Sequence, residues 1–202
     1  MKQPGNEGAI ILQPASYVER LPMDRFFDAP QPLEIELGAG DGSFLVAWAG
    51  LRSERNFCGV ERLLGRLRKI ERKVRRAGFP HVRLLRIEAG YFLEYLVPQR
   101  SVSALHIYFP DPWPKRKHWR HRLINDAFSE VVARALIPSG VIYLRTDDQP
   151  YYAQMKQVFE CNAKFEAVAT PPELRAVLTD FERGFHARGV STLHAAYRLK
   201  AS

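Results

Sequence analysis

The chain has 202 residues, of which 46% are hydrophobic, and it carries a formal net charge of +8. This length suits one globular domain with a buried core, and the apolar runs are too short to span a membrane. Two cysteines are too few for a disulfide framework or a zinc site, and the first ten residues lack the features of a secretion signal. We therefore expect a cytoplasmic protein with two core thiols, no metal and no membrane partner.

The positive charge is concentrated in two segments. Residues 62–76 contain eight Lys or Arg and one Glu, and residues 115–122 contain five Lys or Arg and no acid. The rest of the chain therefore has a net charge of −4. Clustered positive charge on a mildly acidic body is typical of proteins that bind polyanions. The structural alternative is a solvated helix face together with a basic loop.

Strand and helix patterns alternate along the chain after residue 32. Residues 1–32, with scattered Pro and Gly, are expected to form an N-terminal arm, and residues 33–202 a single domain. The predicted strands are 33–37, 56–61, 82–88, 103–109, 140–146, 164–169 and 192–199. The predicted helices begin at Ser43 and cover about 62–77, 91–96, 120–136 and 150–160, with a short helical turn in the loop before the last strand.

This alternation predicts a parallel sheet with helices on both faces. The last two predicted strands have no full crossover helix between them, so one of them is expected to run antiparallel. The expected fold class is therefore α/β, a three-layer Rossmann-like sandwich. Its sheet is expected to have seven strands, mostly parallel, with an antiparallel strand near the C-terminus.

The second predicted helix separates an apolar face from a basic one. Leu63, Leu67, Ile70 and Val74 follow helical spacing, and the Lys and Arg residues occupy the other face. Gly78 follows the last periodic residues, as expected for a glycine that ends a helix. The pattern predicts an amphipathic helix whose charged side faces solvent or a partner.

A glycine-rich turn follows the first predicted strand. Gly38, Gly40 and Gly42 allow a tight turn and a close approach of ligand to backbone, although such glycines are often only structural. Glu61 ends the second strand, where a carboxylate can accept both hydroxyls of a ribose. Glu36 lies near the end of the first strand, where an unpaired buried charge would be costly. Together these residues predict a cofactor that contains a nucleoside.

The segment FPDPWPKRKHWRHR, residues 109–122, follows the fourth predicted strand. Its three prolines exclude a helix interior or a central strand. This block and the G-x-G-x-G turn resemble the signature of the bacterial single-chain tRNA (guanine-N7)-methyltransferase family, whose members depend on S-adenosylmethionine. RTDDQPY at 145–151 and TDFE at 179–182 also match, and the resemblance extends over about 33–199.

The resemblance implies transfer of a methyl group from S-adenosylmethionine to N7 of a variable-loop guanine in tRNA. It implies catalysis by Asp111. The implied cofactor-binding residues are Glu36, Gly38, Gly40, Gly42, Glu61, Glu88 and Asp111. The implied substrate-binding residues are Lys115, Asp147, Thr179, Phe181 and Glu182. Two positions depart from the family pattern, because Glu88 replaces an Asp or Asn and Asp180 replaces a basic residue.

The chemistry agrees with these residue types. Guanine N7 has a lone pair and no proton, so methylation there needs positioning and charge stabilisation but no general base or metal. Asp147 and Glu182 could accept hydrogen bonds from guanine N1–H and N2–H₂, and the Lys and Arg of 115–122 could contact phosphates. Structural alternatives remain, because Asp111 could cap a turn, Asp147 could cap the next helix, and Thr179–Glu182 fits a capping box.

Other functions compete with this one. The chain could methylate another RNA, a protein side chain or a small metabolite, or it could be a non-catalytic RNA-binding module on the same fold. A nicotinamide-dependent oxidoreductase is disfavoured, because Ser43 occupies the position of the third glycine in the dinucleotide fingerprint. The sequence leaves a monomer and a homodimer equally open.

Overall fold

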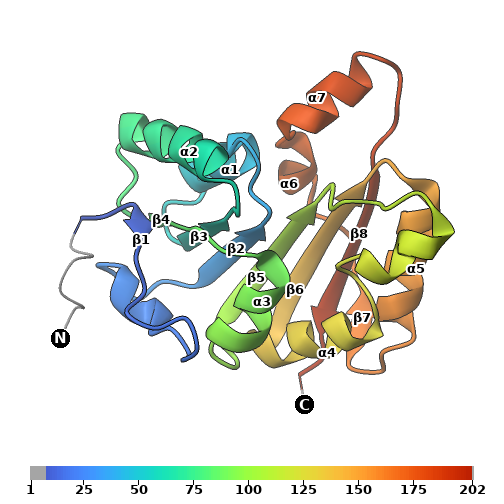
Figure 1. The fold of residues 1–202 in the computed structure, drawn as a ribbon, viewed down its shortest axis with the longest axis horizontal. Coiled ribbons are helices and arrows are strands. Elements are labelled where there is room, and N and C mark those ends of the chain that lie inside the picture. Colours follow the sequence, from blue (N-terminus) through green and yellow to red (C-terminus); the bar gives the residue numbers. More distant parts are fainter. Residues whose placement is uncertain (1–7, 202) are drawn as a thin grey trace.

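A computed structural model describes residues 8–201 of the chain. A single eight-stranded sheet, in the order β1-β4-β3-β2-β5-β6-β8-β7, forms the middle of a three-layer sandwich (Figure 1). The strands are β1 (Ile11–Leu12), β2 (Leu33–Leu37), β3 (Asn56–Val60), β4 (Val82–Leu85), β5 (Val102–Tyr108), β6 (Leu136–Thr146), β7 (Phe165–Ala167) and β8 (Leu193–Leu199). The helices are α1 (Ser43–Leu51), α2 (Leu64–Ala77), α3 (Ala89–Tyr91), α4 (Asp126–Ala135), α5 (Gln149–Glu160), α6 (Pro172–Ala176) and α7 (Asp180–His186).

The strand directions confirm the predicted mostly parallel sheet. Every neighbouring pair from β1 to β6 is parallel, whereas β8 runs antiparallel to both β6 and β7. The predicted number of seven strands was wrong, because β1 adds an eighth. β1 has only two residues, and its pairing depends on a neighbour far along the chain: the Leu84 N–H donates to the Ile10 carbonyl at 2.7 Å. A two-residue strand has no periodicity that a sequence pattern could reveal.

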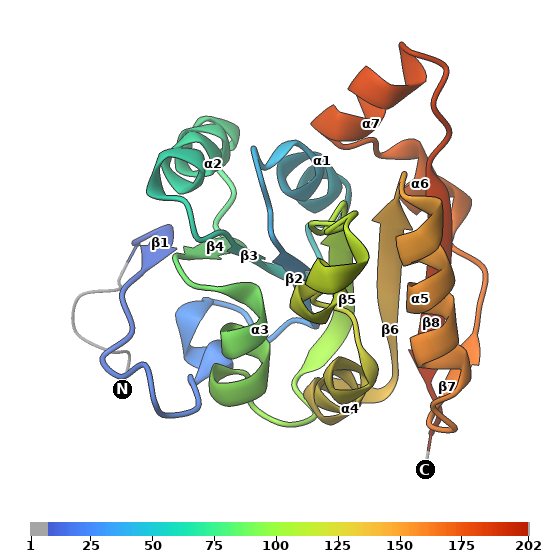
Figure 2. The ribbon, with the colours of Figure 1, turned by 45° about the vertical axis from the view of Figure 1, so that its right-hand side comes forward.

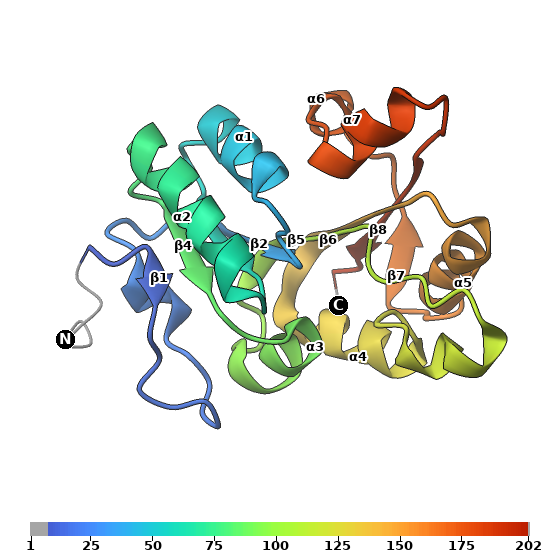
Figure 3. The ribbon, with the colours of Figure 1, turned by 45° about the horizontal axis from the view of Figure 1, so that its top comes forward.

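Helices cover both faces of the sheet (Figures 2 and 3). Phe44 of α1, Ile70 of α2 and Leu174 of α6 belong to one buried cluster. The opposite cluster contains residues of α4, α5 and the 3₁₀ helix η1 (Met23–Phe26). Side chains alternate along β2, so Ile35 packs in this second cluster while Glu34 contacts α1 through Trp48.

Capping residues set the helix boundaries, and some of these boundaries differ from the predicted ranges. Gly78 ends α2 in the left-handed conformation, as predicted. Ser43 is the first residue of α1, and Gly42 precedes it as the N-cap. The predicted helix at 120–136 was placed too early, because Asn125 caps α4 through a bond from the Phe128 N–H, and 116–121 form the 3₁₀ helix η3. The late loop contains two short helices, α6 and α7, in place of one turn.

The two thiols have different surroundings. Cys58 is buried, and burial raises its pKa to about 12. Cys161 is exposed at the end of α5, so the expectation that both thiols lie in the core was wrong for this one. Across residues 8–201, no helix has the length and apolarity needed to cross a membrane, and no group of three or more His, Cys, Asp or Glu could hold a metal ion.

Candidate active site

A cleft opens at the carboxyl ends of the central parallel strands. The strand order reverses between β2 and β5, which is where ligands of open α/β sheets bind. The cleft has a volume of about 420 Å³. Its lining includes Gly38 after β2, Glu61 after β3, Glu88 after β4 and Asp111 after β5. The fold therefore brings together four of the seven predicted cofactor-binding residues.

The glycine turn needs glycine for two different reasons. Gly38, Gly40 and Gly42 have φ of +78°, +57° and +75°, a region that disfavours side chains. A Cβ at Gly42 would also lie 2.7 Å from Cγ2 of Ile70, so this glycine lets α2 pack against the turn. A Cβ at Gly38 would meet nothing within 4 Å, so the backbone there is open to a ligand.

Glu61 connects the glycine turn to the start of α2. Its Oε2 accepts from the Gly40 N–H at 3.1 Å, and its Oε1 accepts from the Leu63 N–H at 2.8 Å. These bonds fix the carboxylate, and each oxygen keeps a free lone pair for a ligand hydroxyl. Glu88 is held similarly at the start of α3, where the N–H groups of Gly90 and Tyr91 donate to it at 2.8 and 2.7 Å.

Glu36 is buried one residue before the cleft-lining Leu37. Its Oε2 has no hydrogen-bond partner within the described residues. Burial raises the pKa of this carboxyl well above its usual value, and the positive charge of Arg145 opposes that shift. A buried carboxyl with an unpaired oxygen fits a cationic or hydrogen-donating group of a bound ligand.

The turn after β5 holds Asp111 at the rim of the cleft. Phe109 and Trp113, two residues to either side, have φ of +52° and +46°, which is unusual for residues with a Cβ. Pro110 and Pro112 fix the backbone between them. Asp111 is exposed, and it makes no hydrogen bond or ion pair with another residue of 8–201. A strained, stiffened turn thus presents a free carboxylate to the cleft.

Arg122 does not take the role that the sequence indicated. It is 2% exposed, and its guanidinium lies between the rings of Trp119 and Tyr151, with its central carbon 4.4 and 4.7 Å from the ring centroids. Its Nε donates to the Pro112 carbonyl and its Nη1 to Gln154 Oε1, both at 2.7 Å. The prediction that this residue contacts phosphate was wrong, because its guanidinium ties the Asp111 turn to α5.

The remaining Lys and Arg side chains of this segment are exposed. They are Lys115, Arg116, Lys117 and Arg120. The rings of Trp113 and His121 lie 5.1 Å apart, and both residues line the cleft. The basic loop, defined as residues 115–120, therefore adjoins one rim of the cleft.

The predicted TDFE segment begins α7 and has a structural role. The side chain of Thr179 accepts from the Glu182 N–H, and Glu182 accepts from the Thr179 N–H, so the capping-box alternative is confirmed. Glu182 is fully buried, and its Oε2 also accepts from Arg145 at 2.8 Å. Neither residue lines the cleft. Phe181 is 55% exposed, and its ring lies 6.1 Å from that of Phe109 at the cleft.

The cap of the helix that follows β6 lies one residue after the predicted position. Asp148 accepts from the Tyr151 N–H at 2.7 Å, so the alternative that Asp147 caps this helix was wrong. Asp147 is exposed, as is Lys115, and neither lines the cleft. The fold thus brings the predicted cofactor residues together more closely than the predicted substrate residues.

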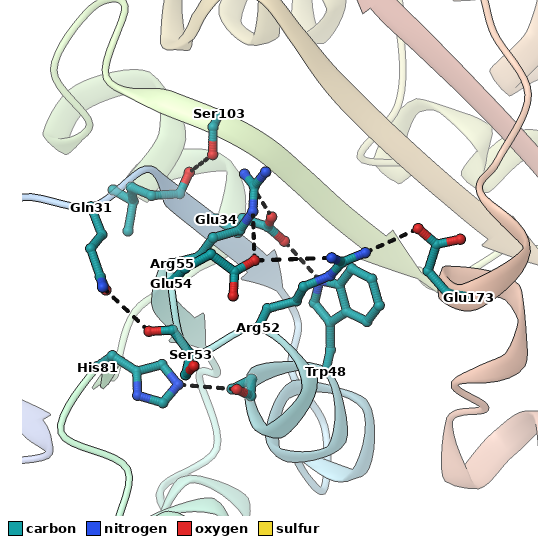
Figure 4. Close-up of polar contacts among 12 residues, drawn as sticks. Gln31, Glu34, Trp48, Arg52, Ser53, Glu54, Arg55, His81, Ser103 and Glu173 are labelled. Atoms are coloured by element: carbon teal, nitrogen blue, oxygen red, sulfur yellow. Dashed lines mark hydrogen bonds and ion pairs between the residues drawn. The ribbon is translucent and has the colours of Figure 1, made fainter.

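Sequence reasoning missed a polar network that holds α1 against the sheet (Figure 4). Glu34 accepts from Trp48 Nε1 at 2.8 Å, contacts His106 Nε2 at 2.9 Å and pairs with Arg55 at 3.2 Å. Burial raises the pKa of Glu34, but the His106, Trp48 and Arg55 contacts outweigh it and leave the pKa lowered. The alternation of Leu and Glu in β2 was the available signal, because a buried carboxylate requires partners.

The three layers and the cleft at the strand reversal define a Rossmann-like fold, and the match to a methyltransferase family model places the chain in the class of Rossmann-like methyltransferases. The crystal structure of the 16S rRNA methyltransferase KamB superposes with a TM-score of 0.60 at 17% identity, covering 84% of this chain and 88% of that one. The profile of a family described as "putative methyltransferase" matches residues 30–195.

Curated relatives identify the particular family. A tRNA (guanine-N(7)-)-methyltransferase of Halorhodospira halophila is 32% identical over 184 residues, which cover 88% of this chain and 79% of that protein. Another, of Leifsonia xyli, is 35% identical over 184 residues, covering 88% and 81%. The chain belongs to the tRNA (guanine-N7)-methyltransferase family.

Proposed function

We propose that this protein transfers a methyl group from S-adenosylmethionine to N7 of a guanine in tRNA. The observation that carries the proposal is the convergence of Glu61, Glu88 and Asp111 on one cleft at the strand reversal. Family membership supplies the substrate class, since the relatives are named for this reaction.

The residues of the cleft fit the cofactor. Glu61 is fixed by two backbone N–H groups and can accept from the ribose hydroxyls. The open backbone at Gly38 lets a ligand approach the glycine turn, and the unpaired oxygen of Glu36 suits a positively charged group. When bound, S-adenosylmethionine supplies a methyl group activated by a sulfonium charge.

Asp111 acts by position and charge. The attacking N7 atom carries no proton, so the carboxylate has no proton to remove. Instead it stabilises positive charge near the reacting atoms, a contribution that depends on a fixed geometry. The two prolines and the anchor at Arg122 supply that geometry.

The substrate-binding roles divide between exposed and buried residues. Asp147 is an exposed acceptor suited to the guanine N1–H and N2–H₂ groups, and Phe181 offers an exposed ring beside the cleft. Thr179 and Glu182 hold the start of α7 and thereby position Phe181. Lys115 and its basic neighbours supply phosphate contacts.

The proposal is tested with an unmodified tRNA transcript and S-adenosylmethionine labelled in its methyl group. We expect labelled N7-methylguanosine in the nucleoside digest. Asp111→Ala should abolish turnover while retaining tRNA binding, whereas Asp126→Ala, an exposed aspartate on α4 outside the cleft lining, should retain the wild-type rate. Cofactor binding without any N7-methylguanosine would overturn the assignment, and wild-type turnover by Asp111→Ala would overturn the role of that residue.

A further inference from the structure

The outer face of α2 carries a row of basic side chains that the cleft does not use. We define the α2 stripe as Arg68, Lys69, Arg72 and Arg76, all of them exposed. Arg68, Arg72 and Arg76 follow one another at intervals of four residues and so share one side of the helix. The opposite side is buried, because Leu67, Ile70 and Val74 are all 0% exposed.

The stripe is not neutralised within the described part of the chain. Two other basic residues of α2 have acidic partners: Lys73 Nζ binds Asp41 Oδ2 at 2.5 Å, and Arg75 pairs with Glu71 at 3.0 Å. No stripe side chain makes a hydrogen bond or ion pair with another residue of 8–201. Like charges four residues apart destabilise a helix. The sequence therefore retains an unfavourable arrangement that an external anion would relieve.

The stripe continues from the rim of the cleft. Arg62, two residues before α2, and Arg66, in its first turn, line the cleft directly. From Arg66 to Arg76 the helix advances about 15 Å away from it. The basic loop adjoins the cleft through Trp113 and His121. A polyanion whose base enters the cleft would thus pass between two basic surfaces.

We propose that the α2 stripe is a second contact surface for the phosphate backbone of tRNA, across the cleft from the basic loop. This inference rests on the proposed function for the identity of the RNA. The stripe side chains are unconstrained cations, which suits contacts to phosphates and gives no base-specific readout. Contacts on both rims would fix the direction in which the RNA crosses the cleft, and hence which base reaches it.

An anionic membrane fits the same surface less well. A helix that lies in a membrane surface inserts its apolar side between the lipids. The apolar side of α2 is already buried in a cluster shared with α1 and the sheet, and the helix lies in an outer layer of the fold (Figure 3). Leu63, at the cleft end, is 45% exposed, but no apolar residue lies among the stripe positions. The exposed surface of α2 therefore carries charge but no apolar face that could insert into a membrane.

The test compares two variants with the same change in net charge. The stripe variant carries Arg68→Gln, Lys69→Gln, Arg72→Gln and Arg76→Gln. The control variant carries Arg100→Gln, Arg134→Gln, Lys164→Gln and Lys200→Gln, which remove four exposed cations around a separate pocket beside β8. The Kd for a fluorescent unmodified tRNA transcript is measured by anisotropy between about 50 and 200 mM KCl, the range over which phosphate contacts alter affinity most visibly.

We expect the stripe variant to lose about 0.7–0.9 units of salt slope per phosphate contact, roughly 3 units for four contacts, with at least about a tenfold rise in Kd. The control variant should remain close to wild type. Equal effects in the two variants would overturn the proposal, since net charge alone would then explain them. An unchanged salt slope in a folded stripe variant would also overturn the proposal. So would a result in which the stripe is needed for binding to phosphatidylserine vesicles but not for binding to tRNA.

Failure of the proposed function gives a different result. If the protein binds tRNA with a stripe-dependent salt slope but forms no N7-methylguanosine, the stripe assignment survives and the reaction assignment fails. If N7-methylguanosine forms normally and the slope does not depend on the stripe, only the stripe assignment fails. If the stripe variant melts well below wild type, Arg72→Gln is compared with Arg134→Gln, two single exposed substitutions with the same change in net charge, and only the first should lower the salt slope, by about 0.7–0.9 units.

Discussion

Replacing Arg122 with Ala should separate anchoring of the Asp111 turn from RNA binding. The guanidinium makes two bonds of 2.7 Å, to the Pro112 carbonyl and to Gln154 Oε1, and lies 3.8 Å from Asp148. Hydrogen bonds to a charged group contribute about 1.5–3 kcal/mol each. Arg122→Ala removes both bonds and leaves the two neutral acceptors without a donor. We therefore expect this substitution to destabilise the fold by about 3–5 kcal/mol, within the sum of two such bonds.

The loss should appear in both stability and turnover. For a chain of this size, 1 kcal/mol corresponds to about 2–4 °C in Tm, so the expected decrease is roughly 6–20 °C. Without its anchor the Pro112 carbonyl is free to move, and a misplacement of about 1 Å near the reacting atoms can reduce turnover about 100-fold. Arg122→Lys can restore only one of the two bonds, so its stability should fall between wild type and Arg122→Ala.

Arg120 provides the matched control. It is exposed, and its side chain makes one long contact, 3.5 Å from Nε to His121 Nε2. Arg120→Ala should change stability by no more than about 0.5 kcal/mol and should lower the salt slope of tRNA binding by about 1. Thermal melts, kcat at saturating tRNA and the salt slope are measured for both variants. The reasoning is refuted if Arg122→Ala melts like wild type, keeps its kcat and weakens tRNA binding as Arg120→Ala does.

Three further substitutions test other parts of the site. Glu182→Ala removes the carboxylate partner of the buried Arg145, which keeps only its bonds to the Leu174 and Val177 carbonyls, and it also removes the capping box. Chemical denaturation should therefore show a loss of about 3–5 kcal/mol, and a loss below about 1 kcal/mol would contradict this. The folded-state pKa of Glu36 is raised above 4.5, so wild type loses stability as the pH rises from 4.5 through that pKa. Glu36→Gln does not titrate, so its Tm minus that of wild type should increase as the pH rises above 4.5; a constant difference would refute the shift. Gly42→Ala combines a φ of +75° with a Cβ 2.7 Å from Ile70, so we expect a stability loss of about 2–4 kcal/mol in thermal melts, and a wild-type Tm would contradict the packing argument.

Local sequence patterns were sufficient to predict much of the fold and the strand-end residues that line the cleft. The alternation of apolar and basic residues in α2, and Gly78 at its end, fixed that helix to within two residues at its start. Gly38 and Asp111 come after predicted strands and Glu61 ends one, and parallel strands end at the same edge of a sheet. Their convergence on one cleft therefore follows from their places in the sequence, without any knowledge of side-chain contacts.

Other features depended on partners that lie far away in the chain. Arg122 bonds residues 10 and 32 positions away, and Arg145 bonds a carboxylate 37 positions away. In the sequence Arg122 is one of several equivalent cations in a basic loop, and Glu182 is a polar residue in a motif. Whether such a side chain faces solvent or the interior is decided by what packs against it, and a charge enters the interior only where partners are supplied.

The sequence by itself determined the fold class, the strand-end carboxylates and the location of positive charge, because those depend on periodicity and on position relative to strands. Only the tertiary structure decided which charges are available to a ligand. It buries Arg122 and Glu182 as anchors, leaves Asp111 exposed at the cleft, and turns the α2 stripe outward without a partner in the described residues. The physical reason is that the burial and pairing of a charged side chain depend on contacts between segments that are distant in the sequence, and no local pattern encodes those contacts.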